Sequence, residues 1–266
     1  MSHSIESFLD PATCEAVIGA VNDFVDRAYT PERCRLRQAY VYEYRLGMEA
    51  FAFAVHCPGS QETRHLPGFG LEELPQPLPR IFREVCARMG LSRGRVLFNV
   101  ARYPEDSPPV AAHFDGELFE FELRPDGGGS YVRSGLRPAE VALVTLRNET
   151  AACGTTLHGP DGRVIQTRAR VGELLRFDNL EYRHGVPATG RRAGGASSNR
   201  PRWIRYTIGW RALEQDCADW HDGRPLRPVA LREAVEIEER FLAETWPRLV
   251  DETVARGHFP FRSPCS

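Results

Sequence analysis

The 266-residue sequence contains no lysine, so all 34 residues in its Lys and Arg total are arginine. This composition is typical of a GC-rich genome, and it excludes no function. The sequence also lacks an excess of charge of either sign, because its formal net charge at pH 7 is -2. A near-neutral chain favours neither a nucleic-acid partner nor an anionic membrane as partner.

No run of about 20 apolar residues, the length that spans a bilayer, occurs in the sequence. The N-terminus lacks the basic region and long apolar run that mark a signal peptide. The seven cysteines are odd in number and none lies in a CxxC pair, which argues against a zinc cluster or a disulfide framework. We therefore expect a soluble, cytoplasmic protein without a membrane partner.

The remaining composition is that of a globular protein, with 42% hydrophobic and 26% charged residues. Many short stretches rich in β-branched and aromatic residues are separated by Gly and Pro turns, which predicts a mainly β protein with a sandwich or jelly-roll core. Asp10-Pro11 is a typical helix start. We expect one domain, with a helical and strand part over residues 1–92, a jelly-roll core over about 93–215 and a helical tail over about 216–266.

The stretch from Tyr103 to Asp115 reads YPEDSPPVAAHFD and ends in a His-x-Asp motif. In an extended strand, residues two apart point to the same face, so His113 and Asp115 can bind one metal ion side by side. His184 is the third candidate ligand. Two histidines and one carboxylate that leave other metal positions open are the pattern of non-haem Fe(II) oxygenases. A His-x-Asp motif alone is common by chance, so its surroundings decide the interpretation.

The surroundings form an ordered series of motifs. Tyr103 stands ten residues before His113, and the series continues with Cys153-Gly154-Thr155-Thr156, Gly172 to Phe177, His184, and Arg205-Tyr206-Thr207 with Trp210 behind it. In this order, over roughly Phe8 to Trp210, the chain resembles the prolyl-4-hydroxylase-like branch of the Fe(II)/2-oxoglutarate-dependent dioxygenases. Two departures from that family are Cys153 in place of a Gly and a longer loop after His184.

The resemblance implies a double-stranded β-helix (jelly-roll) oxygenase that uses Fe(II), 2-oxoglutarate and O2. It implies that His113, Asp115 and His184 hold the metal. It also implies that Arg205 binds the distal carboxylate of 2-oxoglutarate, with Thr207 and Tyr103 alongside. A planar guanidinium fits a carboxylate with two hydrogen bonds, which supports an Arg in this role. Arg202 is the rival for this role, although a regular strand places it on the opposite face.

The intact carboxylate of Asp115 favours hydroxylation, because related halogenases carry a small residue there. Desaturation and cyclisation use the same triad and remain open. The candidate substrate-binding residues are Asn99, Glu117 and Thr155, and each also has a purely structural interpretation. The loop over residues 188–201 is rich in Gly and Ser, and we expect it to act as a lid.

The expected substrate is a small molecule, such as a free amino acid or a natural-product intermediate, whose hydroxylation releases succinate and CO2. One alternative is a hydroxylase of prolyl or other residues in a peptide or a carrier-bound substrate. Another is a cupin-like metal protein without redox chemistry, which has no need of an Arg for a keto acid. A β-sandwich interaction module with a fortuitous triad is the third alternative. Both a monomer and a homodimer are compatible with the sequence.

Overall fold

The computed structural model describes residues 3–36, 38–40, 48–61, 63–115, 119–123, 129–133, 136–150, 154–190, 203–214, 217–221 and 224–240, together with residues 243 and 247. Its helices are α1 (Pro11–Ala28), α2 (Pro31–Arg35), the 3-10 helix η1 (Leu71–Glu73), α3 (Leu78–Arg88) and α4 (Leu231–Arg240). Most of the other regular elements are strands, as the sequence predicts. No helix in the described part of the chain is long and apolar enough to cross a membrane.

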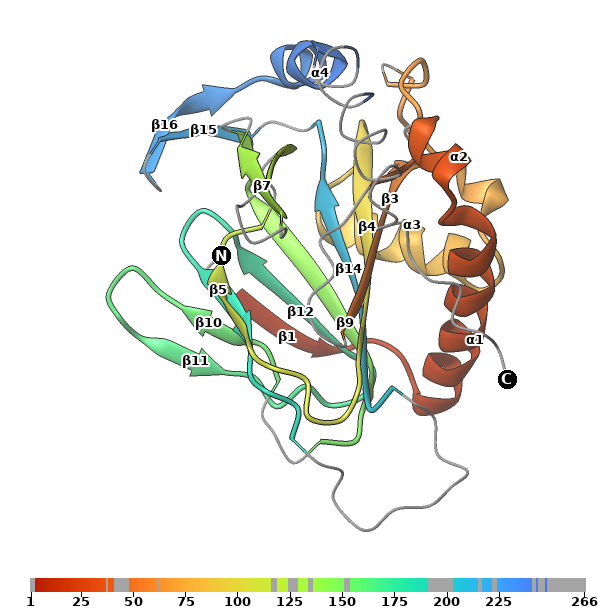
Figure 1. The fold of residues 1–266 in the computed structure, drawn as a ribbon, viewed down its shortest axis with the longest axis vertical. Helices are drawn as coiled ribbons and strands as arrows, with labels where there is room; N and C mark the ends of the chain where they lie inside the picture. The colour runs from red at the N-terminus through yellow and green to blue at the C-terminus, as the bar shows by residue number, and fades with distance from the viewer. Residues whose placement is uncertain are drawn as a thin grey trace.

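The larger sheet has seven antiparallel strands in the order β1-β12-β9-β14-β4-β3-β2 (Figure 1). In chain order they are β1 (His3–Ser7), β2 (Ala39–Tyr40), β3 (Glu49–His56), β4 (Arg95–Tyr103), β9 (Glu140–Asn148), β12 (Glu173–Asp178) and β14 (Arg205–Ala212). The edge strand β1 was not predicted, because its sequence His-Ser-Ile-Glu-Ser carries only one large apolar residue.

The smaller sheet has four strands in the order β11-β10-β13-β5. They are β5 (Val110–His113), β10 (Thr156–His158), β11 (Val164–Gln166) and β13 (Arg183–Val186). The strands of the two sheets pair in a nested order along the chain: β4 pairs with β14, β5 with β13, β9 with β12, and β10 with β11. This nested pairing is that of a jelly roll, so the predicted fold class is confirmed.

Successive side chains of β14 point alternately to the two faces of the larger sheet. Tyr206 donates a hydrogen bond to Asn22 of α1, and Trp210 packs against Phe82 of α3 with ring centroids 5.5 Å apart. Helices α1 and α3 therefore cover one face of the sheet, whereas the smaller sheet lies on the other (Figure 1). The odd-numbered residues of β14, Arg205 to Arg211, face the space between the two sheets.

Helix α1 begins as the sequence predicts. Asp10 accepts a hydrogen bond from the backbone N–H of Thr13 at 2.9 Å, and Pro11 occupies the first helical position. An N-cap of this kind satisfies a backbone donor that the helix leaves without a partner, and contributes about 1 kcal/mol. The buried side of α1, which includes Val17, Val21 and Phe24, packs into the main hydrophobic core.

The expected helical tail from about residue 216 is wrong at its start. The chain there forms β15 (Cys217–His221) and β16 (Arg224–Val229), an antiparallel pair that joins β8 (Leu136–Pro138) in a small sheet, and α4 begins only at Leu231. Asp222-Gly223 between the two strands is a typical two-residue hairpin sequence, which was overlooked. A further hairpin consists of β6 (Phe119–Leu123) and β7 (Gly129–Arg133). The organisation as a single domain stays a prediction.

A buried ion-pair network joins α4 to the larger sheet. Glu214 accepts a hydrogen bond from the backbone N–H of Arg95 at 2.9 Å and also contacts its guanidinium. Glu238 of α4 lies 3.0 Å from the same guanidinium. Because all three side chains are fully buried, loss of Arg95 would leave two buried carboxylates without the guanidinium that both of them contact.

Candidate metal centre

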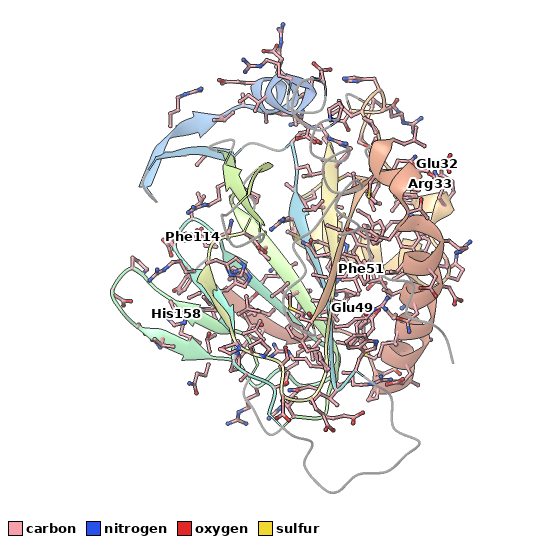
Figure 2. All side chains as sticks on the ribbon, viewed as in Figure 1. Glu32, Arg33, Glu49, Phe51, Phe114 and His158 are labelled. Atoms are coloured by element: carbon pink, nitrogen blue, oxygen red, sulfur yellow. The ribbon has the colours of Figure 1, made fainter. Side chains whose placement is uncertain are left out.

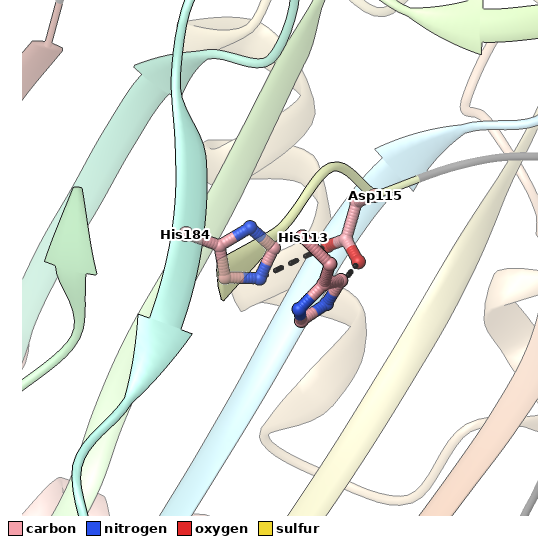
Figure 3. A group of neighbouring side chains, drawn as sticks. All are labelled: His113, Asp115 and His184. Atoms are coloured by element: carbon pink, nitrogen blue, oxygen red, sulfur yellow. Dashed lines mark ion pairs between the residues drawn. The ribbon is translucent and has the colours of Figure 1, made fainter. Parts of the chain in front are cut away.

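The three predicted ligands come together beside the paired strands β5 and β13 (Figure 3). His113 ends β5, His184 is the second residue of β13, and the two are directly paired in the register of these neighbouring strands. Asp115 lies two residues beyond the end of β5. Side-chain ligand atoms of all three residues lie within 4.8 Å of one another.

The separations suit a single metal ion. Nε2 of His113 lies 3.5 Å from Oδ1 of Asp115, and Nε2 of His184 lies 3.7 Å from Oδ2. Ligand atoms that are each about 2.1 Å from one ion lie about 3.0 Å apart at right angles and about 4.2 Å apart when opposite. The two histidine–carboxylate separations lie between these limits, and two imidazoles with one carboxylate are a donor set for a first-row metal such as Fe(II), with positions left for other ligands.

Each histidine presents Nε2 to the centre. His113 makes a 2.9 Å hydrogen bond from Nδ1 to the carbonyl of Ala111, which fixes the ring and leaves the Nε2 lone pair for a metal. Nδ1 of His184 is buried and has no hydrogen-bond partner among the described residues. Burial lowers the pKa of His184 to about 4, with His113 and Arg211 adding to the shift against the opposing charge of Asp115. His184 is therefore neutral at physiological pH, as a metal ligand must be.

The charges around the centre keep Asp115 ionised. Burial alone would raise the pKa of Asp115, but the Arg211 guanidinium, with the hydrogen bond and charge of His113, outweighs it and holds this pKa well below its usual range. For His113 burial is again the largest influence and lowers the pKa, but hydrogen bonding and charge from Asp115 leave it raised. A metal ion bound at Nε2 would displace a proton from this ring.

Arg211 is a residue of the centre that the sequence analysis missed. Its Nη1 lies 2.7 Å from Oδ1 of Asp115, and its side chain is only 3% exposed. The signal was present in the sequence, because Arg211 stands an even number of residues after Arg205 and Thr207 on the same strand. The same alternation that placed those two residues on the inner face places Arg211 there as well.

The residues expected to bind 2-oxoglutarate gather around the beginning of β14. Arg205 is 1% exposed and is paired with Tyr103 of β4, over whose ring its guanidinium lies at 5.5 Å. Its Nη2 donates a 3.4 Å hydrogen bond to Thr155. A small cavity nearby is lined by Thr145, Thr155, Thr167 and Thr207, by the acidic Glu173, and by apolar side chains that include Leu143 and Leu175. A buried cation beside a hydroxyl-rich cavity suits a carboxylate.

The predicted substrate-binding residues have different outcomes. Asn99 lies on the inner face of β4, paired with Gly209, and its Oδ1 is buried without a hydrogen-bond partner among the described residues. Thr155 contacts Arg205, so the structure places it beside the residue predicted to bind the co-substrate. Glu117, the rival Arg202 and most of the predicted lid lie outside the described residues. These roles stay predictions.

No protein-family model and no curated protein matches this chain. Among solved structures, a Pseudomonas putida prolyl-4-hydroxylase is 16% identical, with 79% of this chain and 92% of that chain covered and a TM-score of 0.41. The α-ketoglutarate-dependent carbocyclase SnoK of nogalamycin biosynthesis is 11% identical, with coverages of 86% and 90% and a TM-score of 0.43. HygX from Streptomyces hygroscopicus, with nickel, 2-oxoglutarate and hygromycin B bound, is 10% identical, with coverages of 83% and 86% and a TM-score of 0.42. These values are too low to assign the activity of any of these proteins to this chain.

Proposed function

We propose that this protein is an Fe(II)- and 2-oxoglutarate-dependent oxygenase that hydroxylates an unactivated C–H bond of a small molecule. One observation carries the proposal, namely that His113, Asp115 and His184 converge on the inner side of a jelly roll whose strand β14 also directs Arg205 inward. A facial triad with open positions suits O2 chemistry. A buried guanidinium on the same inner face suits a dicarboxylate co-substrate.

Fe(II) held by the triad would supply the oxygen chemistry, in which oxidative decarboxylation of 2-oxoglutarate to succinate and CO2 is coupled to oxidation of the substrate. The protein's own residues would orient the reactants. Arg205 binds the distal carboxylate of the keto acid, and Thr207 and Tyr103 border it. Arg211 neutralises Asp115 and keeps its carboxylate in one orientation. Close control of geometry is the main contribution that side chains make to such a reaction.

The cupin-like alternative is less well supported because of Arg205. A metal protein without a keto acid has no need of an arginine on the inner face of β14 beside a threonine-lined cavity. The near-neutral charge of the chain supports a small molecule over a nucleic acid. Asn99 offers a buried amide oxygen on the inner face that a hydroxyl or amino group of a substrate would satisfy.

The test is turnover of 2-oxoglutarate. Purified protein is incubated with Fe(II), ascorbate, O2 and 2-oxoglutarate, and succinate is measured for wild type, His184→Ala and the control His65→Ala. His65 is a suitable control because its side chain is exposed and forms its ion pair with Glu239, which is not a residue of the triad. We expect succinate from wild type and His65→Ala and none from His184→Ala. Equal succinate from all three proteins would contradict the proposal.

The same assay distinguishes the substrate classes. Free amino acids and other small metabolites are added in one series, and proline-containing peptides in another. A small-molecule hydroxylase is expected to release succinate faster with a member of the first series and to add one oxygen atom to it, measured by mass spectrometry. Stimulation by peptides alone would favour the peptidyl alternative.

A further inference from the structure

Asp115, the carboxylate of the proposed metal centre, has a backbone that is not held by a strand. Strand β5 ends at His113, so the ladder between β5 and β13 that fixes the two histidines stops before Asp115. Figure 3 shows the carboxylate on the segment that leaves the end of this strand. Another group must therefore fix the position from which this side chain extends.

Asn179 supplies that contact. Its Oδ1 accepts a hydrogen bond from the backbone N–H of Asp115 at 2.9 Å, and its Nδ2 donates to the backbone carbonyl of Asp115 at 2.6 Å. The second proton of Nδ2 binds the carbonyl of Pro138 at 3.1 Å. The side chain of Asn179 is completely buried, with a relative exposure of 0%. Its amide thus holds both polar backbone groups of Asp115, as a partner strand would do.

The position of Asn179 in the chain links Asp115 to His184. Asn179 directly follows β12, and its own N–H donates to the carbonyl of Ala139 at 2.8 Å. A turn follows β12, and Asp178 stabilises it because its Oδ1 accepts a hydrogen bond from the N–H of Leu180 at 2.7 Å. The chain then enters β13, which carries His184. One short turn thus both delivers a histidine ligand and holds the backbone of the carboxylate ligand.

We infer that Asn179 is a positioning residue of the metal centre, which fixes the backbone of Asp115 so that its carboxylate stays at chelating distance from both histidines. The inference rests on the proposed function, since it assigns a role within the same site. Arg211 holds the carboxylate end of Asp115 and Asn179 holds the backbone end. Outer partners of this kind, when removed, weaken metal binding by about 10- to 100-fold.

The experiment measures metal affinity without any turnover. Metal-free wild type, Asn179→Ala and Asn179→Ser are titrated anaerobically with Co(II) in the absence of 2-oxoglutarate, and the visible absorption of the bound metal is followed. The matched control is Asn148→Ala, because Asn148 also uses its side-chain amide in hydrogen bonds to Ala169 and Thr150 but contacts no ligand of the metal. The Tm of each metal-free variant is recorded in parallel.

We expect the Kd for Co(II) to rise about 10- to 100-fold in Asn179→Ala, less in Asn179→Ser, and not at all in Asn148→Ala. A lower Tm with an unchanged Kd in both Asn179 variants would overturn the inference, because Asn179 would then be purely structural. An equal loss of affinity in Asn148→Ala would overturn it too, as would the failure of both Asn179 variants to fold while Asn148→Ala folds. Absence of Co(II) binding in wild type would instead refute the proposed function, and the inference with it.

Discussion

Replacing Arg205 should remove most of the affinity for 2-oxoglutarate and leave metal affinity intact. Arg205 is 1% exposed, so a carboxylate bound to it is almost fully desolvated. Loss of one partner from a buried, hydrogen-bonded charge pair costs about 2–5 kcal/mol. Taking about 3 kcal/mol, Arg205→Met should raise the Kd for 2-oxoglutarate by roughly 100-fold. Arg205→Lys keeps the charge but loses the two-pronged geometry, and should raise the Kd by roughly 10-fold.

The assay for Arg205 is an anaerobic titration of the Fe(II)-loaded protein with 2-oxoglutarate, with metal affinity measured separately. Arg232→Met is the control, because Arg232 lies on the surface of α4 with its side chain 92% exposed. A wild-type Kd for 2-oxoglutarate in Arg205→Met would refute the assignment of Arg205 as the ligand of the distal carboxylate. Arg202 would then be the next candidate for that role. A parallel loss of metal affinity would show that the substitution disturbs the whole centre rather than the keto-acid site.

Two further predictions concern stability. Gly172 has φ of +81°, and a Cβ there would lie 1.9 Å from the carbonyl oxygen of Leu9, so Gly172→Ala should destabilise the protein by about 2 kcal/mol or more in urea unfolding. An unchanged midpoint would contradict this close approach. Burial, reinforced by Arg95 and Arg64, lowers the pKa of His56 to about 4, whereas an unfolded chain has a His pKa of about 6.5. The unfolded state therefore binds the proton first as the pH falls. Metal-free wild type should lose about 2 kcal/mol more stability than His56→Gln between pH 7.5 and pH 5, and equal losses would refute the assignment.

The elements with a local signal in their own residues, such as a cap or an apolar run, were predictable from the sequence. Asp10-Pro11 marked the start of α1, and the apolar run around Val96 marked β4. The hairpin of β15 and β16 could have been found from Asp222-Gly223, but the amphipathic pattern farther on extended the predicted helix too far. Strand β1 could not have been predicted from the sequence, because its pairing with β12 rather than its own composition makes it a strand.

The residues of the site likewise differ in whether a local sequence pattern predicts them. The period of two correctly predicted Arg205 and Thr207 on one face of β14, and applied once more it would have reached Arg211. It also predicted His113 beside Asp115, although β5 ends at His113 and Asp115 lies beyond the strand. Asn179 had no such signal, because its role depends on a contact with a residue 64 positions away that only the folded chain creates. Long-range side-chain-to-backbone contacts leave no periodicity in a sequence, so they are visible only in the structure.

The proposed chemistry is tested most directly by the joint binding of iron and keto acid. Fe(II) and 2-oxoglutarate are added anaerobically to wild type and to His184→Ala, and the visible charge-transfer absorption expected of a chelated keto acid is followed. We predict a band in wild type that saturates with 2-oxoglutarate and is absent in His184→Ala. Metal binding without the band would contradict the oxygenase account and favour a cupin-like metal protein, and a wild type that binds no metal would refute the metal centre itself.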